Sequence, residues 1–321
     1  MEPDRSAFRF RLALEEDIPD CAAIWRTAIN HYITALNQPP MPDDLTVISR
    51  LYAHLRSTDP DHFVVALPAD RAGDGAERVV GFAVAVQREH VWFLSMLFVL
   101  PDVQLRGLGR ELLRRVLPAD GAASVRATAT DSAQPISNAL YSTFGIVPRV
   151  PLLGLIGLPT RADALDDLPS GVTPVPFETI VDSGGSSGHR ELTTVVDGLD
   201  RDLLGFTHSI DHRFLRQQDR RGWLFTGPDG NPLGYGYSAE SGRVGPLLVR
   251  DPELLGSALG FLLRAVEPRG PFLTWIPGAA DRALLAALRA GLRLEPFPIL
   301  LCWDRQPTDF GRYLPISPGL L

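Results

Sequence analysis

The glycine-rich turn at Gln104–Arg110 has residue types and spacing that are suited to binding an anion. It reads Gln104-Leu105-Arg106-Gly107-Leu108-Gly109-Arg110 and follows an apolar run that ends at Val99. Glycines let backbone N–H groups approach an anion closely, and a helix that starts there adds free N–H donors and the positive end of its dipole. Arg106 and Arg110 add positive charge. The segment therefore predicts a pyrophosphate site made of backbone and arginine.

Composition limits the other nucleotide sites that this chain could use. All 31 basic residues are arginine, an enrichment for which the codon usage of a GC-rich genome is a sufficient explanation. Without lysine, the chain has no Walker-A phosphate clamp, no pyridoxal-phosphate Schiff base and no class I aldolase nucleophile. The net charge of −7 argues against a nucleic-acid partner.

Two halves of the chain carry the same order of expected elements. A length of 321 residues predicts two domains. The order strand, two helices, three strands, helix, strand, helix, strand fits residues 8–158 and again residues 172–303, which indicates an internal repeat. Residues 159–176 contain four prolines and are the expected linker. We therefore expect domains at 1–158 and 159–321.

A second informative segment lies on the helix expected at 137–144. It reads Asn138-Ala139-Leu140-Tyr141-Ser142-Thr143-Phe144-Gly145-Ile146. With the glycine-rich turn, it resembles the GNAT superfamily of N-acetyltransferases, and the resemblance covers residues 8–158 in element order. It implies a mixed α/β (α+β) fold: two tandem GNAT-like domains, each a mostly antiparallel sheet with a splayed central strand pair flanked by helices.

A Rossmann dinucleotide site is the alternative for the glycine-rich turn. Three features argue against it. The strand is the fourth of its domain, the pattern is not Gly-x-Gly-x-x-Gly, and no acidic residue ends a strand about 20 residues later.

The resemblance also implies site residues, with acetyl-CoA as cosubstrate. Backbone groups of Leu97, Phe98 and Val99 would hold the acetyl carbonyl and pantetheine, and the turn would hold the pyrophosphate. Asn138 would contact the cofactor. Tyr141 matches the family's general acid, which protonates the leaving thiolate; the pKa of a phenol, about 10, lies close to that of a thiol.

The general base is where the sequence departs from the family's pattern. Many members carry a glutamate on the fourth strand, whereas residues 90–99 hold no carboxylate. His90, Ser95, a water relay and the carboxylates of Glu15-Glu16-Asp17 stay open as alternatives. His31 and Tyr32 are candidates for lining the acceptor pocket. Packing or helix capping explains each of these side chains at least as well.

The second half keeps the repeat but loses the chemistry. Aligning the repeats places Leu254-Leu255-Gly256-Ser257-Ala258-Leu259 on the glycine-rich turn, and it places Leu284 and Ala287 on Asn138 and Tyr141. We therefore expect a degenerate C-terminal domain and an active N-terminal half. We expect no metal site, because His208 and His212 lack ligand companions in sequence and fit a solvated helix face.

Location and partners follow from the remaining features. No apolar run reaches the roughly 18 residues of a membrane span, and the start of the chain does not resemble a signal peptide, so we expect a cytoplasmic protein. The acceptor is expected to be an amine on a small molecule or a peptide. A homodimer is one role that the degenerate half could serve. The alternative function is a non-catalytic acyl-CoA-binding sensor or scaffold.

Overall fold

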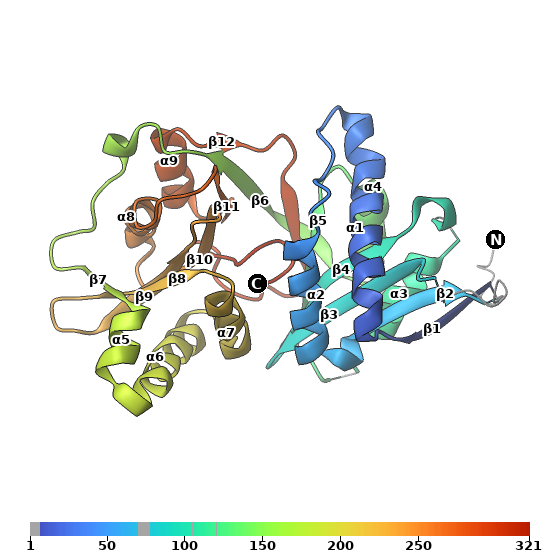
Figure 1. Cartoon of the computed structure of the whole chain (residues 1–321), viewed down its shortest axis with the longest axis horizontal. Helices are drawn as coiled ribbons and strands as arrows, with labels where there is room; N and C mark the ends of the chain where they lie inside the picture. The colour runs from blue at the N-terminus through green and yellow to red at the C-terminus, as the bar shows by residue number, and fades with distance from the viewer. Residues whose placement is uncertain (1–6, 70–77, 105, 120) are drawn as a thin grey trace. The chain divides into compact units, whose positions relative to one another are not determined.

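The computed structural model describes residues 7–69, 78–104, 106–119 and 121–321, which divide into two compact units. The N-terminal unit comprises Met1–Gln87 and Trp92–Ser124. The C-terminal unit comprises Arg88–Val91 and Val125–Leu321. This division follows strand pairing, whereas the expected boundary after residue 158 follows the sequence repeat. Figure 1 shows both units with most of their elements labelled.

The N-terminal unit is a sheet in the order β1-β2-β3-β4 with helices on both faces. Phe82 lies against Tyr52 of α2, with ring centroids 5.3 Å apart. The neighbouring Gly81 faces Leu112 of α3, because side chains alternate along a strand. The elements are β1 (Phe8–Leu12), α1 (Ile18–Ile33), α2 (Thr46–Thr58), β2 (Phe63–Pro68), β3 (Gly81–Arg88), β4 (Val91–Val99) and α3 (Leu108–Val116).

The C-terminal unit has a longer sheet, in the order β5-β13-β6-β11-β10-β9-β8-β7. Its strands are β5 (Val125–Asp131), β6 (Val147–Gly157), β7 (Thr173–Pro176), β8 (Arg221–Thr226), β9 (Pro232–Ser238), β10 (Arg243–Val249), β11 (Phe272–Pro277), β12 (Arg293–Leu294), β13 (Ile299–Trp303) and β14 (Tyr313–Leu314). Its helices are α4 (Pro135–Ser142), α5 (Phe177–Ser183), α6 (Gly188–Leu203), α7 (Ser209–Gln217), α8 (Leu255–Leu262) and α9 (Asp281–Ala290).

Helices cover both faces of the C-terminal sheet as well. Trp223 and Phe225 of β8 belong to the buried core that α8 and α9 form. Gly222, which points to the opposite face, leaves room for the ring of Phe177 on α5. Antiparallel pairing dominates among the described strands, and together these features confirm the expected mixed α/β fold.

The two halves of the sequence exchange their last strands. β13, near the end of the chain, lies between β5 and β6 and pairs antiparallel with both. β6 pairs with β13 over Val147–Leu152 and with β11 over Leu152–Gly157. The expected strand at 294–303 is therefore two strands, β12 and β13, and only β13 takes part in this exchange.

The C-terminal unit contains a splayed strand pair. β10 and β11 pair in parallel only at Arg243–Val244 and Leu273–Thr274. Further along β10, Leu247 and Leu248 pair instead with β14. β14 also contacts β11, and its residues Tyr313 and Leu314 are fully buried. The end of the chain therefore occupies the space where the pair diverges.

The order of helices and strands expected from the sequence is confirmed, with small differences. The structure adds α5, which begins at Phe177, and the short strand β14 near the end of the chain. Among the described residues, no helix has both the length and the apolar character needed to cross a membrane.

Candidate functional site

The glycine-rich turn leads from β4 into α3 of the N-terminal unit. Gly107 has a φ of 80°, in the left-handed region that favours glycine, and is the N-cap of α3. Glycine supplies no capping side chain, so no side-chain oxygen competes for the first N–H groups of the helix. Arg106 is exposed, Gly109 and Arg110 are half-buried, and Leu108 is buried in the core. Leu105 lies outside the described residues.

Gln104 ties this turn to the end of β4. Its Nε2 donates a hydrogen bond of 2.9 Å to the carbonyl oxygen of Val99. The amide of the next residue, Leu100, donates a hydrogen bond of 2.9 Å to the carbonyl oxygen of Val80, the residue before β3. The backbone before the turn is thus held from both sides. The Gln104 bond uses one of the two acceptor positions of the Val99 carbonyl oxygen.

The end of β4 is less buried than its start. Residues 91–95 are buried, whereas Leu97 and Phe98 are half-buried. The Phe98 ring packs 5.9 Å from that of Phe82. The carbonyl oxygen of Phe98 and a γ-methyl of Val99 lie so close to Gly81 that a Cβ there would be 3.1 and 3.2 Å from them. These contacts fix the backbone that is expected to hold the acyl group.

Asn138 and Tyr141 lie one turn apart on α4, in the C-terminal unit. Asn138 donates from Nδ2 to the carbonyls of Gln134 at 2.8 Å and Asp131 at 3.0 Å. Its Oδ1 is buried with no hydrogen-bond partner among the described residues, as an acceptor waiting for a ligand donor would be. Tyr141 is only 5% exposed, and burial raises the pKa of its phenol above the usual value of 10.

The candidates for the general base have different surroundings. Asp17 accepts hydrogen bonds from Arg11 at 2.9 Å and from the Leu14 amide at 2.7 Å, so it has a structural role. Glu15 and Glu16 are exposed. Ser95 is buried, and the ring of His90 packs 6.5 Å from that of Phe206. No residue is singled out as the base.

The counterpart of the turn in the C-terminal unit is not an anion site. Before α8, Oδ1 of Asp251 accepts a hydrogen bond of 3.0 Å from the amide of Glu253. A carboxylate therefore sits at the helix start, where it would repel a phosphate. Ala287 on α9, which aligns with Tyr141, is fully buried and has no proton to give.

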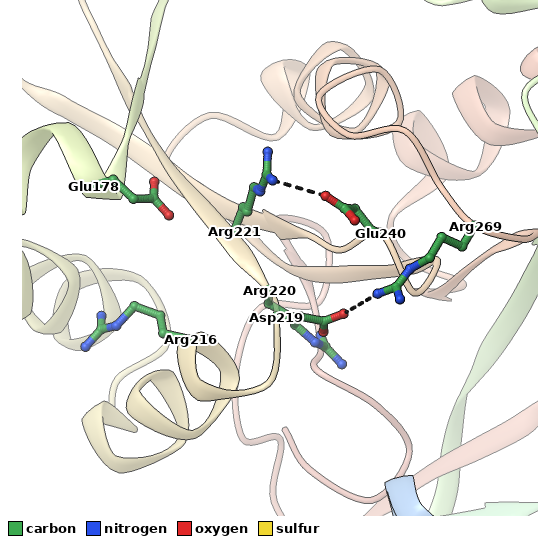
Figure 2. Close-up of a pocket in the computed structure, with 7 residues that line it drawn as sticks. All are labelled: Glu178, Arg216, Asp219, Arg220, Arg221, Glu240 and Arg269. Atoms are coloured by element: carbon green, nitrogen blue, oxygen red, sulfur yellow. Dashed lines mark hydrogen bonds and ion pairs between the residues drawn. The ribbon is translucent and has the colours of Figure 1, made fainter. Parts of the chain in front are cut away.

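A surface hollow in the C-terminal unit is rich in charge (Figure 2). Arg221 pairs with Glu240 at 3.1 Å, and Arg269 pairs with Asp219 at 3.5 Å. These carboxylates offset much of the positive charge, so the hollow is a poor anion site. Its lining residues are Glu178, Arg216, Asp219, Arg220, Arg221, Glu240 and Arg269.

The expectation of a solvated face for His208 and His212 is wrong. Both side chains are buried, at 1% and 2% exposure, against the buried carboxylate of Asp200. Asp200 lies on the preceding helix, α6, and it comes close to the histidines only because α6 and α7 pack together. The only signal in the sequence was the four-residue spacing of the histidines.

Known proteins share the fold of this chain and a family motif in its first half. The chain has the fold of tandem acetyltransferase-like proteins. Residues 25–146 match the model described as Acetyltransferase (GNAT) family, which confirms the resemblance to the GNAT superfamily that the sequence motifs indicate. The match supports acyl transfer as the general class of reaction. No curated protein matches the sequence.

Three solved structures are similar over nearly the whole chain. A candidate acetyltransferase from Pyrococcus horikoshii has a TM-score of 0.69 at 17% identity, covering 98% of this chain and 96% of that one. A GCN5-related N-acetyltransferase from Sphaerobacter thermophilus has a TM-score of 0.60 at 17% sequence identity, and the match covers 97% of this chain and 100% of that one. A tandem GNAT protein from the clavulanic acid biosynthesis pathway has a TM-score of 0.56 at 14% sequence identity, and the match covers 92% of this chain and 98% of that one. At these identities the similarity shows the fold.

Proposed function

We propose that this protein is an N-acetyltransferase that transfers the acetyl group of acetyl-CoA to an amine, with the N-terminal half active. The observation that carries the proposal is the start of α3. There, Gly107 in the left-handed conformation begins a helix that has no capping side chain, at the end of the turn that follows β4. Such a helix start binds the charged oxygens of a pyrophosphate through backbone N–H groups.

The expected reaction is direct attack. The lone pair of the acceptor amine forms a bond to the thioester carbonyl carbon, and a backbone N–H of β4 stabilises the oxyanion. The carbon–sulfur bond then breaks, and the thiolate takes a proton from the phenol of Tyr141. The attacking nitrogen releases its extra proton to solvent water, and the phenolate regains a proton from the same source. The phenol is protonated at neutral pH, as a proton donor must be, and burial raises its pKa, so it holds its proton more tightly than an exposed phenol does. Asn138, with its buried Oδ1, is proposed to accept a hydrogen bond from the cofactor.

The segment between α1 and α2 is proposed as one wall of the acceptor pocket. It is attached to α1 at two points. Oδ1 of Asn30 accepts a hydrogen bond of 2.8 Å from the Met41 amide, and Arg26 pairs with Asp43. With prolines at 39, 40 and 42, these bonds favour a fixed wall over a moving lid.

The C-terminal half is proposed to have lost catalysis. Asp251 places a carboxylate before α8, in the segment that corresponds to the glycine-rich turn. β14 occupies the space beside the diverging strands β10 and β11. Both features remove room or charge that an acyl-CoA molecule would need.

Thiol release from acetyl-CoA tests the proposal against the sensor alternative. Purified full-length protein is incubated with acetyl-CoA and a panel of amines, amino acids, peptides and aminoglycosides, and free CoA is measured with a thiol reagent. An acetyltransferase releases CoA only when a suitable acceptor is present. Acetyl-CoA binding by calorimetry, with no acceptor-dependent release across the panel, would instead support a sensor. Absence of acetyl-CoA binding would overturn both.

A further inference from the structure

Three buried side chains meet between α6 and α7 of the C-terminal unit. Asp200 lies near the end of α6, His208 is the N-cap of α7, and His212 follows one turn later. Their exposures are 0%, 1% and 2%. Burying a carboxylate and two imidazoles together costs several kcal/mol of desolvation free energy unless the groups are paired or ligated. None of the three belongs to the proposed acetyltransferase site.

The ligand atoms of these residues lie at separations suited to one metal ion. Nδ1 of His208 is 2.9 Å and Nε2 of His212 is 3.2 Å from Oδ2 of Asp200. One ligand atom from each residue lies within 4.8 Å of the other two. Ligands about 2.0–2.1 Å from a tetrahedral zinc ion are roughly 3.3 Å from one another. The two histidine–carboxylate separations lie within a few tenths of an ångström of that value.

From this arrangement we propose that Asp200, His208 and His212 form a binding site for a divalent transition-metal ion of the zinc class. Two imidazoles and one carboxylate are a ligand set that zinc uses in proteins. Two histidines four residues apart lie on one side of a helix turn, which lets both reach the same ion. The site is independent of acetyl-CoA and of the acceptor. It departs from the expectation that the chain has no metal site.

Neighbouring tyrosines hold two of the three ligands in place. The hydroxyl of Tyr235 donates a hydrogen bond of 2.7 Å to Oδ1 of Asp200, the oxygen that does not face the histidines. The hydroxyl of Tyr237 lies 2.8 Å from Nδ1 of His212, which leaves Nε2 directed at the cluster. Metal-bound histidines and carboxylates usually have such outer hydrogen-bond partners, which set the orientation of each ligand.

Two further polar atoms beside the cluster are buried without a hydrogen-bond partner in the part of the chain that the structure describes. They are Nε2 of His208 and the hydroxyl of Tyr313. Leaving such an atom unsatisfied costs about 1–3 kcal/mol. Burial raises the pKa of Tyr313, and the negative charges of Asp200 and Asp211 raise it further. Zinc with three protein ligands can hold a water as fourth ligand, and such a water is a hydrogen-bond partner for atoms of this kind.

The full-length protein, freed of metal and refolded from denaturant, provides the test. Refolding matters because the ligands are buried and an ion would enter as the chain folds. Cobalt(II) is the probe, since bound cobalt with few ligands absorbs visible light strongly. We expect one cobalt per chain after gel filtration, an absorption band that zinc abolishes by displacement, and a melting temperature several degrees higher with zinc. Wild-type protein that refolds but retains no metal would overturn the proposal and leave a metal-free hydrogen-bonded cluster.

Matched variants assign the site. His208→Gln, His212→Gln and Asp200→Asn should each lower metal affinity at least tenfold and abolish the zinc-dependent rise in melting temperature. The control is His189→Gln, on an exposed position of α6, which should bind metal as the wild type does. Equal binding by the control and all three variants would place the metal elsewhere and overturn the assignment. Since the readout is metal content, the result does not depend on acetyltransferase activity.

Discussion

The side-chain amide of Gln104 donates a hydrogen bond of 2.9 Å to the carbonyl oxygen of Val99, and this bond joins the glycine-rich turn to the end of β4. This bond spans the segment between β4 and α3. It positions the backbone of both ends of the proposed acetyl-CoA site, although Gln104 itself need not touch the cosubstrate.

Gln104→Ala should therefore weaken acetyl-CoA binding. Loss of one hydrogen bond costs about 1 kcal/mol, which is about fivefold in the dissociation constant. Calorimetry with acetyl-CoA measures the change. The control is Gln217→Ala, at an exposed position on α7. Unchanged affinity in Gln104→Ala would show that the turn keeps its shape without this bond.

Gly107 should be sensitive to any side chain. Its φ of 80° costs an alanine about 1–2 kcal/mol, so Gly107→Ala should weaken acetyl-CoA binding by roughly fivefold or more. Asparagine adopts this conformation more readily, and Gly107→Asn should recover part of the loss. Equal affinity of all three proteins in calorimetry would contradict the proposed role of the helix start.

Tyr141→Phe should separate chemistry from binding. Removing a general acid typically lowers turnover by about 10²-fold or more, while the packed ring keeps its place on α4. Acetyl-CoA affinity should stay near the wild-type value. Tyr52→Phe is the control for loss of a buried hydroxyl; the Tyr52 hydroxyl has no hydrogen-bond partner among the described residues, whereas that of Tyr141 interacts with Ser137. Turnover is measured by thiol release, and an equal loss in both variants would argue for packing as the common cause.

Asp17 should make stability depend on pH. Burial acts to raise the pKa of Asp17, but the hydrogen bonds from Arg11 and the Leu14 amide outweigh it and leave the pKa below its usual value. A lowered folded-state pKa means that Asp17 stabilises the fold above the unfolded pKa, near 3.9. That contribution is lost as pH falls through the folded value.

Asp17→Asn should accordingly reduce the free energy of unfolding by about 1–3 kcal/mol at pH 7, and the difference from wild type should shrink below pH 4. Urea unfolding at several pH values measures this, with exposed Asp61→Asn as the control. A difference that is constant with pH would mean that the carboxylate charge is not what stabilises the fold.

The strand exchange predicts the behaviour of the isolated first half. A fragment of residues 1–158 lacks β13, so the edges of β5 and β6 that β13 pairs with would be exposed. Exposed strand edges promote aggregation, and we expect the fragment to elute as aggregates on gel filtration. Full-length protein is the reference. A monomeric fragment with cooperative thermal unfolding would show that the first half folds without the exchanged strand.

The sequence by itself determined the features that depend on neighbouring residues. Apolar periodicity located the helices and strands in order, as at Ile18–Ile33 and Val91–Val99. The glycine-rich turn was recognisable because the left-handed conformation of Gly107 and the helix start after it are local properties of the chain. The loss of the turn in the second half was visible for the same reason.

The tertiary structure decided what depends on residues far apart in the chain. Both halves end in an apolar strand, and nothing in either strand states which sheet it joins, so the exchange of β6 and β13 follows only from packing. Likewise, His208 and His212 on a short amphipathic helix fit a solvated face as well as a buried one. The packing of α7 against α6 and β9 buries them and brings Asp200 to 2.9 Å from His208. Local patterns set the type of each element, but burial and partners come from the arrangement of elements that the sequence separates.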